Sequence, residues 1–424
     1  MPQTHKHSPS VAIIGAGASG LMAAEVLSAS GVSVQVYEQM PTAGRKILMA
    51  GKTGLNISHS EPLDTFITRY DDERVGRWVE QFCADDIRAW MSGLGIDSYV
   101  GSSGRIFPTQ MKATTLLRAW LHRLHEQGVH IHYRHRCTDV RDDTATFSVQ
   151  DKDGRTINEF SQSFDVIILA CGGGSYARLG SDGAWQKWFS LDELTPLYAS
   201  NVGIVRTWSP FMADFFGQAL KRVTASVGQH TGHGDIVISH YGMESGLIYK
   251  LNHAMKDELD RQGKIRLVLD LLPNKSPKAI ASTFAQSKKQ SLNNLCRKVG
   301  LSPIKIALLR ECTNKTNWSD FDKMAGLIKA LPIYFDGFRP MDEAISTGGG
   351  VKLSALTDTL QSRHNPHLFV IGEMMDWNAP TGGYLLTACL AMGQVVGHHV
   401  AKLLTDTAHG SNQDRLPIGR DGLS

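Results

Sequence analysis

The chain has 424 residues, and its 44 lysines and arginines nearly balance its 41 aspartates and glutamates, for a formal net charge of +3. This length predicts two or three folding units, and the balanced charge argues against a nucleic-acid groove or a polybasic membrane patch. Six cysteines are scattered without any CxxC spacing, which is typical of reduced thiols in the cytosol and argues against a dithiol–disulfide reductase. We therefore expect a cytoplasmic protein with no nucleic-acid partner.

No segment has the pattern of a membrane protein. The polar tail, residues 1–10, lacks the apolar core of a signal peptide. The longest apolar stretch, residues 384–396, contains polar residues and is too short to span a bilayer. We therefore expect a soluble protein with no membrane partner.

The chain is organised around its first strand, turn and helix. An apolar strand, residues 11–14, is followed by the turn GAGASG and a small, apolar run, residues 21–24. In this motif the glycines permit a tight turn, close backbone approach to a pyrophosphate, and close packing of helix on strand. Free N–H groups at the helix N-terminus then bind phosphate. The predicted dinucleotide-binding residues here are Gly15, Gly17, Ala18, Ser19 and Gly20.

A carboxylate follows the second strand. The apolar strand over residues 32–37 leads into Glu38, eighteen residues past Gly20. A carboxylate at this place can accept hydrogen bonds from an adenosine ribose, which favours FAD or NAD over NADP. The neighbouring Gln39 is assigned to the same site.

A glycine-punctuated stretch, residues 41–56, comes next and contains two adjacent cations. Its weak periodicity predicts a loop, and loops after parallel strands carry ligand contacts in such folds. We expect the cations to meet phosphate and the backbone to approach a flat ring, with a solvated surface loop as the alternative. The predicted site residues of this stretch are Gly44, Arg45, Lys46, Gly51, Leu55 and Asn56.

Five blocks, spread in order over residues 11 to about 398, carry a resemblance to a known family. They are GAGASGLMAAE, Glu38 with GRKILMAGKTGLNIS, GSSGRIFPTQMKA, LACGGGSYARLGSDGAW and GEMMDWNAPTGGYLL. Together they resemble the HI0933-like, or BaiN-like, family of FAD-dependent flavoproteins. The resemblance implies an α/β fold with a Rossmann-like FAD-binding domain of the two-dinucleotide-fold type, and the activity of an NAD(P)/FAD-dependent oxidoreductase.

One position departs from that family. Many members end a glycine-rich segment in Arg-Cys-Asn, whereas this chain has Gly54-Leu55-Asn56. The cysteine position is occupied by leucine, so thiol chemistry there is not expected.

The pattern of residues 62–136 predicts helices and a strand, and no ligand-binding or metal site. Apolar residues recur at helical spacing over 62–94, and a helix over 112–127 precedes a strand over 129–136. Five histidines lie between residues 122 and 135, but no carboxylate or cysteine completes a ligand set. We predict no metal site.

A further apolar strand is followed by a glycine-rich turn. Residues 164–170 form an all-apolar run, typical of a buried parallel strand, and end in three glycines, which predict ligand-facing backbone. The predicted site residues are Ala170, Cys171, Gly172 and Gly173. The resemblance adds Val140, near which the backbone borders adenine in the resembled flavoproteins.

From about residue 194 to 345 the pattern of apolar and polar residues changes. Short alternating segments predict antiparallel strands of a small barrel or sheet, and residues 277–330 show helical periodicity with a helix start at Ser302-Pro303. The predicted domains are an FAD-binding domain over 1–193 and 346–424, an inserted β-barrel domain over 194–272 and 331–345, and a helical subdomain over 273–330.

The helical subdomain carries a basic cluster that includes Lys275, Arg297 and Arg310. Such a set usually marks a solvated face. The alternative is attraction of an anionic substrate or a reduced cofactor.

A third glycine end follows the strand over residues 368–371. The helix predicted over 384–402 starts without side-chain obstruction, and N–H groups there can stabilise the negative charge of a reduced flavin. The predicted site residues are Gly372, Glu373, Asp376, Gly382, Gly383, Tyr384 and Leu385. The resemblance implies that Glu373 or Asp376 lies near the ribityl chain. The strand ends at residues 15, 172 and 372 are expected to converge on one large ligand, and the chain beyond Thr405 is expected to fray.

These patterns predict an FAD-dependent oxidoreductase whose middle domain covers a substrate pocket over the flavin. The flavin carries the chemistry, so no catalytic residue is predicted. The resemblance implies a reductase or dehydrogenase acting on a small organic substrate, such as an enone. No second GxGxxG follows a strand, so no separate NAD(P)H domain is predicted, and NADH and NADPH stay open as transient reductants.

Two alternatives remain. A non-catalytic NAD- or FAD-binding redox sensor would need only the first glycine motif. A flavin-dependent RNA-modifying enzyme would need a one-sided basic surface, to which a net charge of +3 gives little support. The pattern leaves the oligomeric state open.

Overall fold

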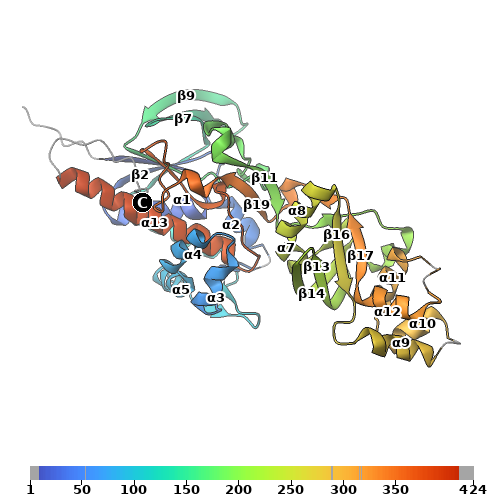
Figure 1. The fold of residues 1–424 in the computed structure, drawn as a ribbon. Helices are drawn as coiled ribbons and strands as arrows, with labels where there is room; N and C mark the ends of the chain where they lie inside the picture. Colours follow the sequence, from blue (N-terminus) through green and yellow to red (C-terminus); the bar gives the residue numbers. More distant parts are fainter. Residues whose placement is uncertain (1–8, 53, 288–289, 315, 317, 410–424) are drawn as a thin grey trace, which may run out of the picture. The chain divides into compact units, whose positions relative to one another are not determined.

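The computed structural model describes residues 9–52, 54–287, 290–314, 316 and 318–409 (Figure 1). The chain divides into two compact units. Unit 1 consists of Met1–Tyr198 and Thr347–Ser424, and unit 2 of Ala199–Ser346. The predicted domain boundaries, including the division of the insertion into barrel and helical parts, stay a prediction.

The centre of unit 1 is a five-stranded parallel sheet in the order β20-β10-β1-β2-β6. Its strands are β1 (Ser10–Ile14), β2 (Ser33–Glu38), β6 (His130–Tyr133), β10 (Val166–Leu169) and β20 (Leu368–Val370). The residues of β10 and β20 are all buried, as expected for strands covered on both faces. The predicted Rossmann-type α/β fold is thus confirmed.

Helix α1 (Ala18–Ala29) packs against α13 (Tyr384–His409). Two glycines of α13 permit the close approach. A Cβ atom on Gly393 would lie 2.6 Å from the Ser19 carbonyl oxygen, and one on Gly397 would lie 2.6 Å from Val26 Cβ. The third glycine block is therefore joined to the first through the core.

Helix α13 extends beyond the predicted end at residue 402 and beyond Thr405, because its helical backbone continues to His409. The rest of the tail expected to fray, residues 410–424, lies outside the described residues, as does most of the polar N-terminal tail. Among the described residues, no helix combines the length and apolarity needed to cross a bilayer.

The remaining elements of unit 1 surround the parallel sheet. Strands β3, β5 and β4 form one small antiparallel sheet, and β7, β8 and β9 form another. The bounds are α2 (Arg45–Ala50), β3 (Ser58–His59), α3 (Leu63–Phe66), α4 (Glu73–Glu80), α5 (Ala84–Gly93), β4 (Ser98–Val100), β5 (Arg105–Pro108), α6 (Ala113–Glu126), β7 (His135–Arg141), β8 (Thr144–Gln150) and β9 (Thr156–Ser163).

Helix α2 is a difference from the predicted loop over residues 41–56. It begins after Gly44, whose φ of 66° places it in the left-handed region, and ends at Ala50. The two cations, Arg45 and Lys46, therefore lie in the first turn of a short helix.

Unit 2 contains a seven-stranded antiparallel sheet in the order β17-β16-β13-β14-β15-β12-β18. Its strands are β12 (Ile204–Val205), β13 (Ala219–Val227), β14 (His230–Ser239), β15 (Gly242–Glu244), β16 (Ile265–Asp270), β17 (Leu331–Phe335) and β18 (Gly337–Phe338). Its helices are α7 (Gly246–Lys250), α8 (Asn252–Gln262), α9 (Pro277–Ala285), α10 (Leu292–Lys298), α11 (Pro303–Cys312) and α12 (Phe321–Lys329).

The helices between β16 and β17 share one hydrophobic core with the sheet. Buried side chains from both, such as Phe284 of α9 and Leu267 of β16, belong to the same cluster. Helix α11 begins at Pro303 after Ser302, where the sequence predicts a helix start.

Two strands mark where the chain leaves unit 1 and returns to it. These are β11 (Leu194–Ser200) and β19 (Ser346–Val351), which pair with each other in a two-stranded sheet. A Cβ atom on Gly349 would lie 2.2 Å from the Pro196 carbonyl oxygen, so the strands are in close contact.

Candidate functional site

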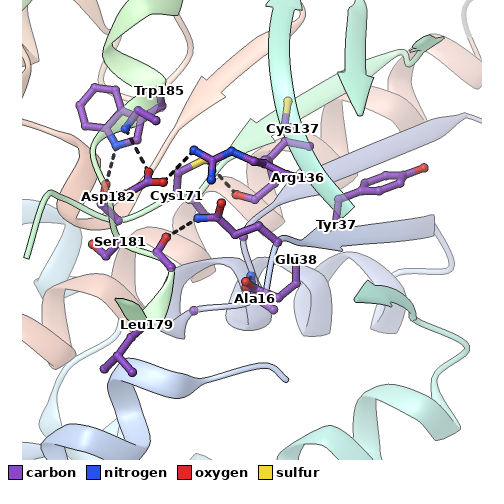
Figure 2. A pocket seen from close by; sticks show the side chains of 18 of the residues that line it. Ala16, Tyr37, Glu38, Arg136, Cys137, Cys171, Leu179, Ser181, Asp182 and Trp185 are labelled. Carbon is purple, nitrogen blue, oxygen red and sulfur yellow. Dashed lines mark hydrogen bonds and ion pairs between the residues drawn. The ribbon is translucent and has the colours of Figure 1, made fainter. Parts of the chain in front are cut away.

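A pocket opens at the carboxyl ends of β1, β2 and β10 (Figure 2). This is where open parallel sheets bind ligands, because loops diverge there from neighbouring strands. The lining residues are 14–17, 37–39, 42, 44–46, 135–137, 170–172, 179–182, 184, 185, 187 and 188.

The glycine turn forms the floor of this pocket. Gly15 has a φ of +108°, and a Cβ atom there would lie 2.4 Å from the Ala170 carbonyl oxygen, so β1 and β10 need glycine to approach so closely. A Cβ atom on Gly20 would lie 2.1 Å from the Gly15 carbonyl oxygen. At Gly17 the same atom would meet nothing within 4 Å. Only this last glycine faces open space.

The N-terminus of α1 adjoins that space. Gly17 caps the helix without any side-chain hydrogen bond, so no side chain competes with an anion for the first N–H groups. Ser19 and Gly20 are buried in α1, and with Ala18 they lie outside the residues that line the pocket.

Glu38 closes the end of β2. Its Oε2 accepts a hydrogen bond from the Ala16 N–H at 2.8 Å, and its Oε1 accepts one from the Met40 N–H at 2.8 Å. Burial raises the pKa of Glu38, and the two backbone hydrogen bonds oppose this rise. A carboxylate has about four acceptor positions, so this one can still accept bonds from ribose hydroxyls.

The opposite wall comes from residues that sequence reasoning did not assign. Trp185 donates its Nε1–H to the Gly172 carbonyl oxygen at 2.8 Å, and Arg136 donates to Asp182 at 2.8 Å. Gln39, which was predicted, donates to the Gly180 carbonyl oxygen at 2.7 Å. Figure 2 shows Trp185, Asp182 and Arg136 together on this wall.

Two polar atoms of lining residues are buried without a hydrogen-bond partner. They are Nε of Arg45 and Oγ of Ser181. Leaving a buried donor unpaired costs about 1–3 kcal/mol, and such groups in a pocket suggest a polar ligand. The open Gly17, the free helix N-terminus and the Arg45 guanidinium together fit a pyrophosphate.

The glycine blocks that follow β10 and β20 meet beside the pocket through Lys46. Its ammonium group forms an ion pair with Glu373 and donates to Ser175 Oγ at 3.0 Å. Glu373 also accepts from the Thr347 N–H at 2.9 Å, and Thr347 Oγ1 accepts from the Gly174 N–H at 2.8 Å. The blocks that follow β10 and β20 are thus in contact, and their convergence on one ligand stays a prediction.

The third block packs behind the lining residues rather than among them. A Cβ atom on Gly372 would lie 2.4 Å from Ser19 Oγ, and one on Gly383 would lie 2.6 Å from Ser58 Cα. Asp376 accepts from Thr195 Oγ1 at 2.6 Å.

Other predicted residues also lie outside the pocket lining. Leu55 is fully buried, and Asn56 Oδ1 is buried without a hydrogen-bond partner. A Cβ atom on Gly51 would lie 2.3 Å from Ala113 Cβ. The remaining ones are Val140, Gly173, Gly382, Tyr384 and Leu385.

The two cysteines of the pocket, Cys137 and Cys171, have raised thiol pKa values. Burial raises the pKa of Cys137 to about 12, and burial also raises that of Cys171 well above its ordinary value. A thiol with such a pKa is a poor nucleophile. Among the described residues, no group of three or more histidines, cysteines or carboxylates is placed to hold a metal ion.

The model of the HI0933-like protein Rossmann domain matches residues 9–399. The chain belongs to the HI0933-like family. This membership confirms the resemblance predicted from the five blocks and supports the predicted class, an FAD-dependent oxidoreductase.

Two curated proteins resemble this HI0933-like chain over most of their length. A 3-dehydro-bile acid delta(4,6)-reductase of Clostridium scindens is 26% identical over 92% of this chain and 99% of that protein. A ribosomal RNA dihydrouridine synthase of Haemophilus influenzae is 23% identical over 88% of this chain and 93% of that protein.

A solved structure shares the fold. The 3-ketosteroid delta1-dehydrogenase of Sterolibacterium denitrificans aligns with a TM-score of 0.50 at 12% identity, over 92% of this chain and 99% of that one.

Proposed function

We propose that this chain is an FAD-dependent reductase that saturates a carbon–carbon double bond conjugated with a carbonyl group. The observation that carries the proposal is the pocket itself: an open glycine turn with unpaired Arg45 and Ser181 atoms beside it, in a chain of a flavoprotein family. The bound FAD, once reduced by the nicotinamide nucleotide, would supply the hydride to one alkene carbon, and water would supply the proton to the other.

The two curated relatives support the bond type. One name describes reduction of a double bond conjugated with the ketone of a 3-dehydro bile acid. The other describes conversion of uridine to dihydrouridine, in which the reduced bond is conjugated with a carbonyl of the base. The molecules differ, but both contain an electron-poor alkene that accepts hydride.

The residues of the pocket would hold the adenosine diphosphate half of the cofactor. Glu38 would accept hydrogen bonds from ribose hydroxyls, and the N–H groups at Gly17 and the start of α1 would bind pyrophosphate together with Arg45. The Ser181 hydroxyl, which has no hydrogen-bond partner among the described residues, would form a hydrogen bond with the same ligand. The predicted residues beyond the pocket, from Gly51 to Asn56 and from Gly372 to Leu385, remain the proposed contacts of the flavin half.

We assign NADH or NADPH the role of transient reductant and a small organic enone the role of first candidate substrate. The described residues offer no second glycine-rich strand end of the GxGxxG type for a resident nicotinamide cofactor. A uracil in RNA is the second candidate substrate, favoured by the name of the Haemophilus influenzae relative.

The purified protein should show flavin absorbance near about 450 nm, directly or after addition of FAD. Anaerobic titration with NADH and with NADPH should bleach this band, and a panel of enones and dienones should restore it. Absence of the band after addition of FAD would contradict the proposal and favour an NAD-binding sensor. A band that neither nucleotide bleaches would remove NAD(P)H as the reductant.

A further inference from the structure

Unit 2 contains a cavity of its own, with a volume of about 660 Å³. This is within the range of small-molecule and nucleotide sites, about 300–1,000 Å³. It lies between the short 3₁₀ helix η5 (Pro210–Phe215) and the helices α10 and α11. None of the residues predicted to bind the cofactor lines it.

Helix α11 forms one wall, because Pro303, Ile306, Ala307 and Arg310 share one face at helical spacing. The Arg310 guanidinium carbon lies 5.4 Å from the centroid of the Trp318 ring. In this cation–π contact the guanidinium lies over one face of the indole ring.

The Trp318 ring is held in place by a hydrogen bond. Its Nε1–H donates to Thr313 Oγ1 at 3.1 Å, and the Thr313 hydroxyl donates to the Leu309 carbonyl oxygen of α11 at 2.5 Å. A ring held in this way can receive a flat ligand without first losing conformational freedom.

A second aromatic ring stands at the edge of the cavity. Phe211 of η5 is 85% exposed. Helix η5 is tied to α11, because the Glu311 carboxylate accepts from the Ser209 N–H at 3.0 Å and from the Ser209 hydroxyl at 2.5 Å. The Glu311 carboxylate, which lines the cavity, therefore fixes the start of the 3₁₀ helix that carries the exposed Phe211.

The helical segment around the cavity is strongly basic, although the whole chain is not. Residues 273–330 contain eleven lysines and arginines against three acids, a net charge of +8, whereas the whole chain carries +3. The remainder is therefore acidic, at −5. Lys275, Lys278 and Arg297 are exposed and form no ion pair with a described residue, while Lys329 is paired with Asp270.

We propose that this cavity and its basic surroundings bind single-stranded RNA. Exposed bases stack on aromatic side chains and on arginine planes, and phosphates are attracted by surrounding cations. Trp318 and Phe211 would supply the stacking surfaces, and Arg297 and Arg310 would meet the backbone. The inference deepens the proposed function by favouring its second candidate substrate, and it rests on that function only for the reaction performed on the RNA.

The test is fluorescence anisotropy with the full chain carrying its flavin and a labelled, uridine-rich RNA of about 12 nucleotides. Phe211→Ala should weaken binding by about 5- to 100-fold, the usual effect of removing one stacking ring. Arg297→Gln should weaken binding and reduce the slope of log affinity against log salt by about 0.7. Both side chains are exposed. Because they belong to unit 2, a wild-type far-ultraviolet circular dichroism spectrum and urea unfolding curve of the full chain would show that each variant folds.

Matched controls come from the same unit. Tyr334→Ala removes an aromatic ring that is 53% exposed on β17, and Arg261→Gln removes an exposed arginine near the end of α8; neither residue lines the cavity. Both should bind RNA as the wild type does. Absence of RNA binding, or equal losses in the controls, would overturn the inference. The inference would also be overturned if NADPH displaced the RNA and Phe211→Ala weakened the binding of NADPH but not that of RNA.

Binding is measured without turnover, so the two proposals can fail separately. A chain that reduces small enones without binding RNA refutes only the RNA site. A chain that binds RNA through this cavity but reduces no substrate refutes only the reductase.

Discussion

Lys46 and Glu373 form an ion pair although they lie 327 positions apart in the chain. Lys46 belongs to the first turn of α2, and Glu373 lies in the 3₁₀ turn η9 (Gly372–Met374), which follows β20. The same ammonium group contacts Ser175, beyond β10. One cation therefore connects the segments that follow three different strands of the parallel sheet.

Lys46→Met should lower both stability and flavin affinity. The Glu373 side chain is only 15% exposed, so removing its cation leaves a largely buried carboxylate, at a cost of about 1–3 kcal/mol in the free energy of unfolding. Urea unfolding of the apo protein measures this cost. Glu373→Gln, alone and combined with Lys46→Met, completes a double-mutant cycle. Strictly additive losses would show that the pair contributes no coupling energy.

Gly17→Ala and Gly20→Ala should separate binding from folding. A methyl group on Gly17 meets nothing within 4 Å, so the apo protein should unfold at the same urea concentration as the wild type, while flavin affinity falls by about tenfold or more as the methyl enters the expected pyrophosphate position. A methyl group on Gly20 would lie 2.1 Å from a carbonyl oxygen and should destabilise the fold by about 1–3 kcal/mol. Unchanged flavin affinity in the Gly17 variant would contradict the assignment.

Ser181→Ala tests a residue that lies in the block LACGGGSYARLGSDGAW but was not among the predicted site residues. Its hydroxyl has no hydrogen-bond partner, so its removal breaks no bond in the apo protein and should leave the free energy of unfolding the same or slightly higher. Flavin affinity should fall by about 5- to 10-fold if the hydroxyl binds the cofactor. Equilibrium dialysis against FAD measures the change. Ser60→Ala is the control, because Ser60 is exposed and lies far from Ser181 in the sequence. Equal FAD affinity in the two variants would exclude Ser181 from the site.

The Glu61 carboxylate should make stability depend on pH in the acid range. Hydrogen bonds from Arg69 lower the pKa of Glu61 below its ordinary value of 4.5, and a bond from the Tyr384 hydroxyl acts in the same direction. The unfolded chain therefore takes up this proton more readily, so the stabilisation is complete above the ordinary pKa and is lost as pH falls through the lowered one. Glu61→Gln should flatten the unfolding free energy between about pH 5 and 3. Glu80→Gln, on an exposed glutamate, should keep the wild-type slope, and an identical slope in the Glu61 variant would exclude this explanation.

The sheet could be predicted from the sequence because its strands are short apolar runs that end in glycine or an acid. The helix predicted over 112–127 also matches α6, Ala113–Glu126, to within one residue at each end. Helix α2 was missed because six residues contain too few turns for a periodic signal, and the left-handed Gly44 that starts it resembles loop punctuation.

The site was predictable on one side only. Gly17, Glu38 and Arg45 follow strands that the sequence identifies, so their position at the sheet edge could be inferred. Arg136 and Trp185 reach the pocket from β7 and from a 3₁₀ turn, and only the fold brings those segments together. The net charge of +3 is a sum over 424 residues, to which residues 273–330 contribute +8.

The pairing of β11 with β19 means that 148 residues, Ala199–Ser346, begin and end at adjacent points of the nucleotide-binding unit. An insertion with neighbouring ends can be lengthened, shortened or exchanged without moving any strand of the parallel sheet. The parallel sheet of unit 1 can therefore accept insertions of different length and fold at this one position without losing its strand order.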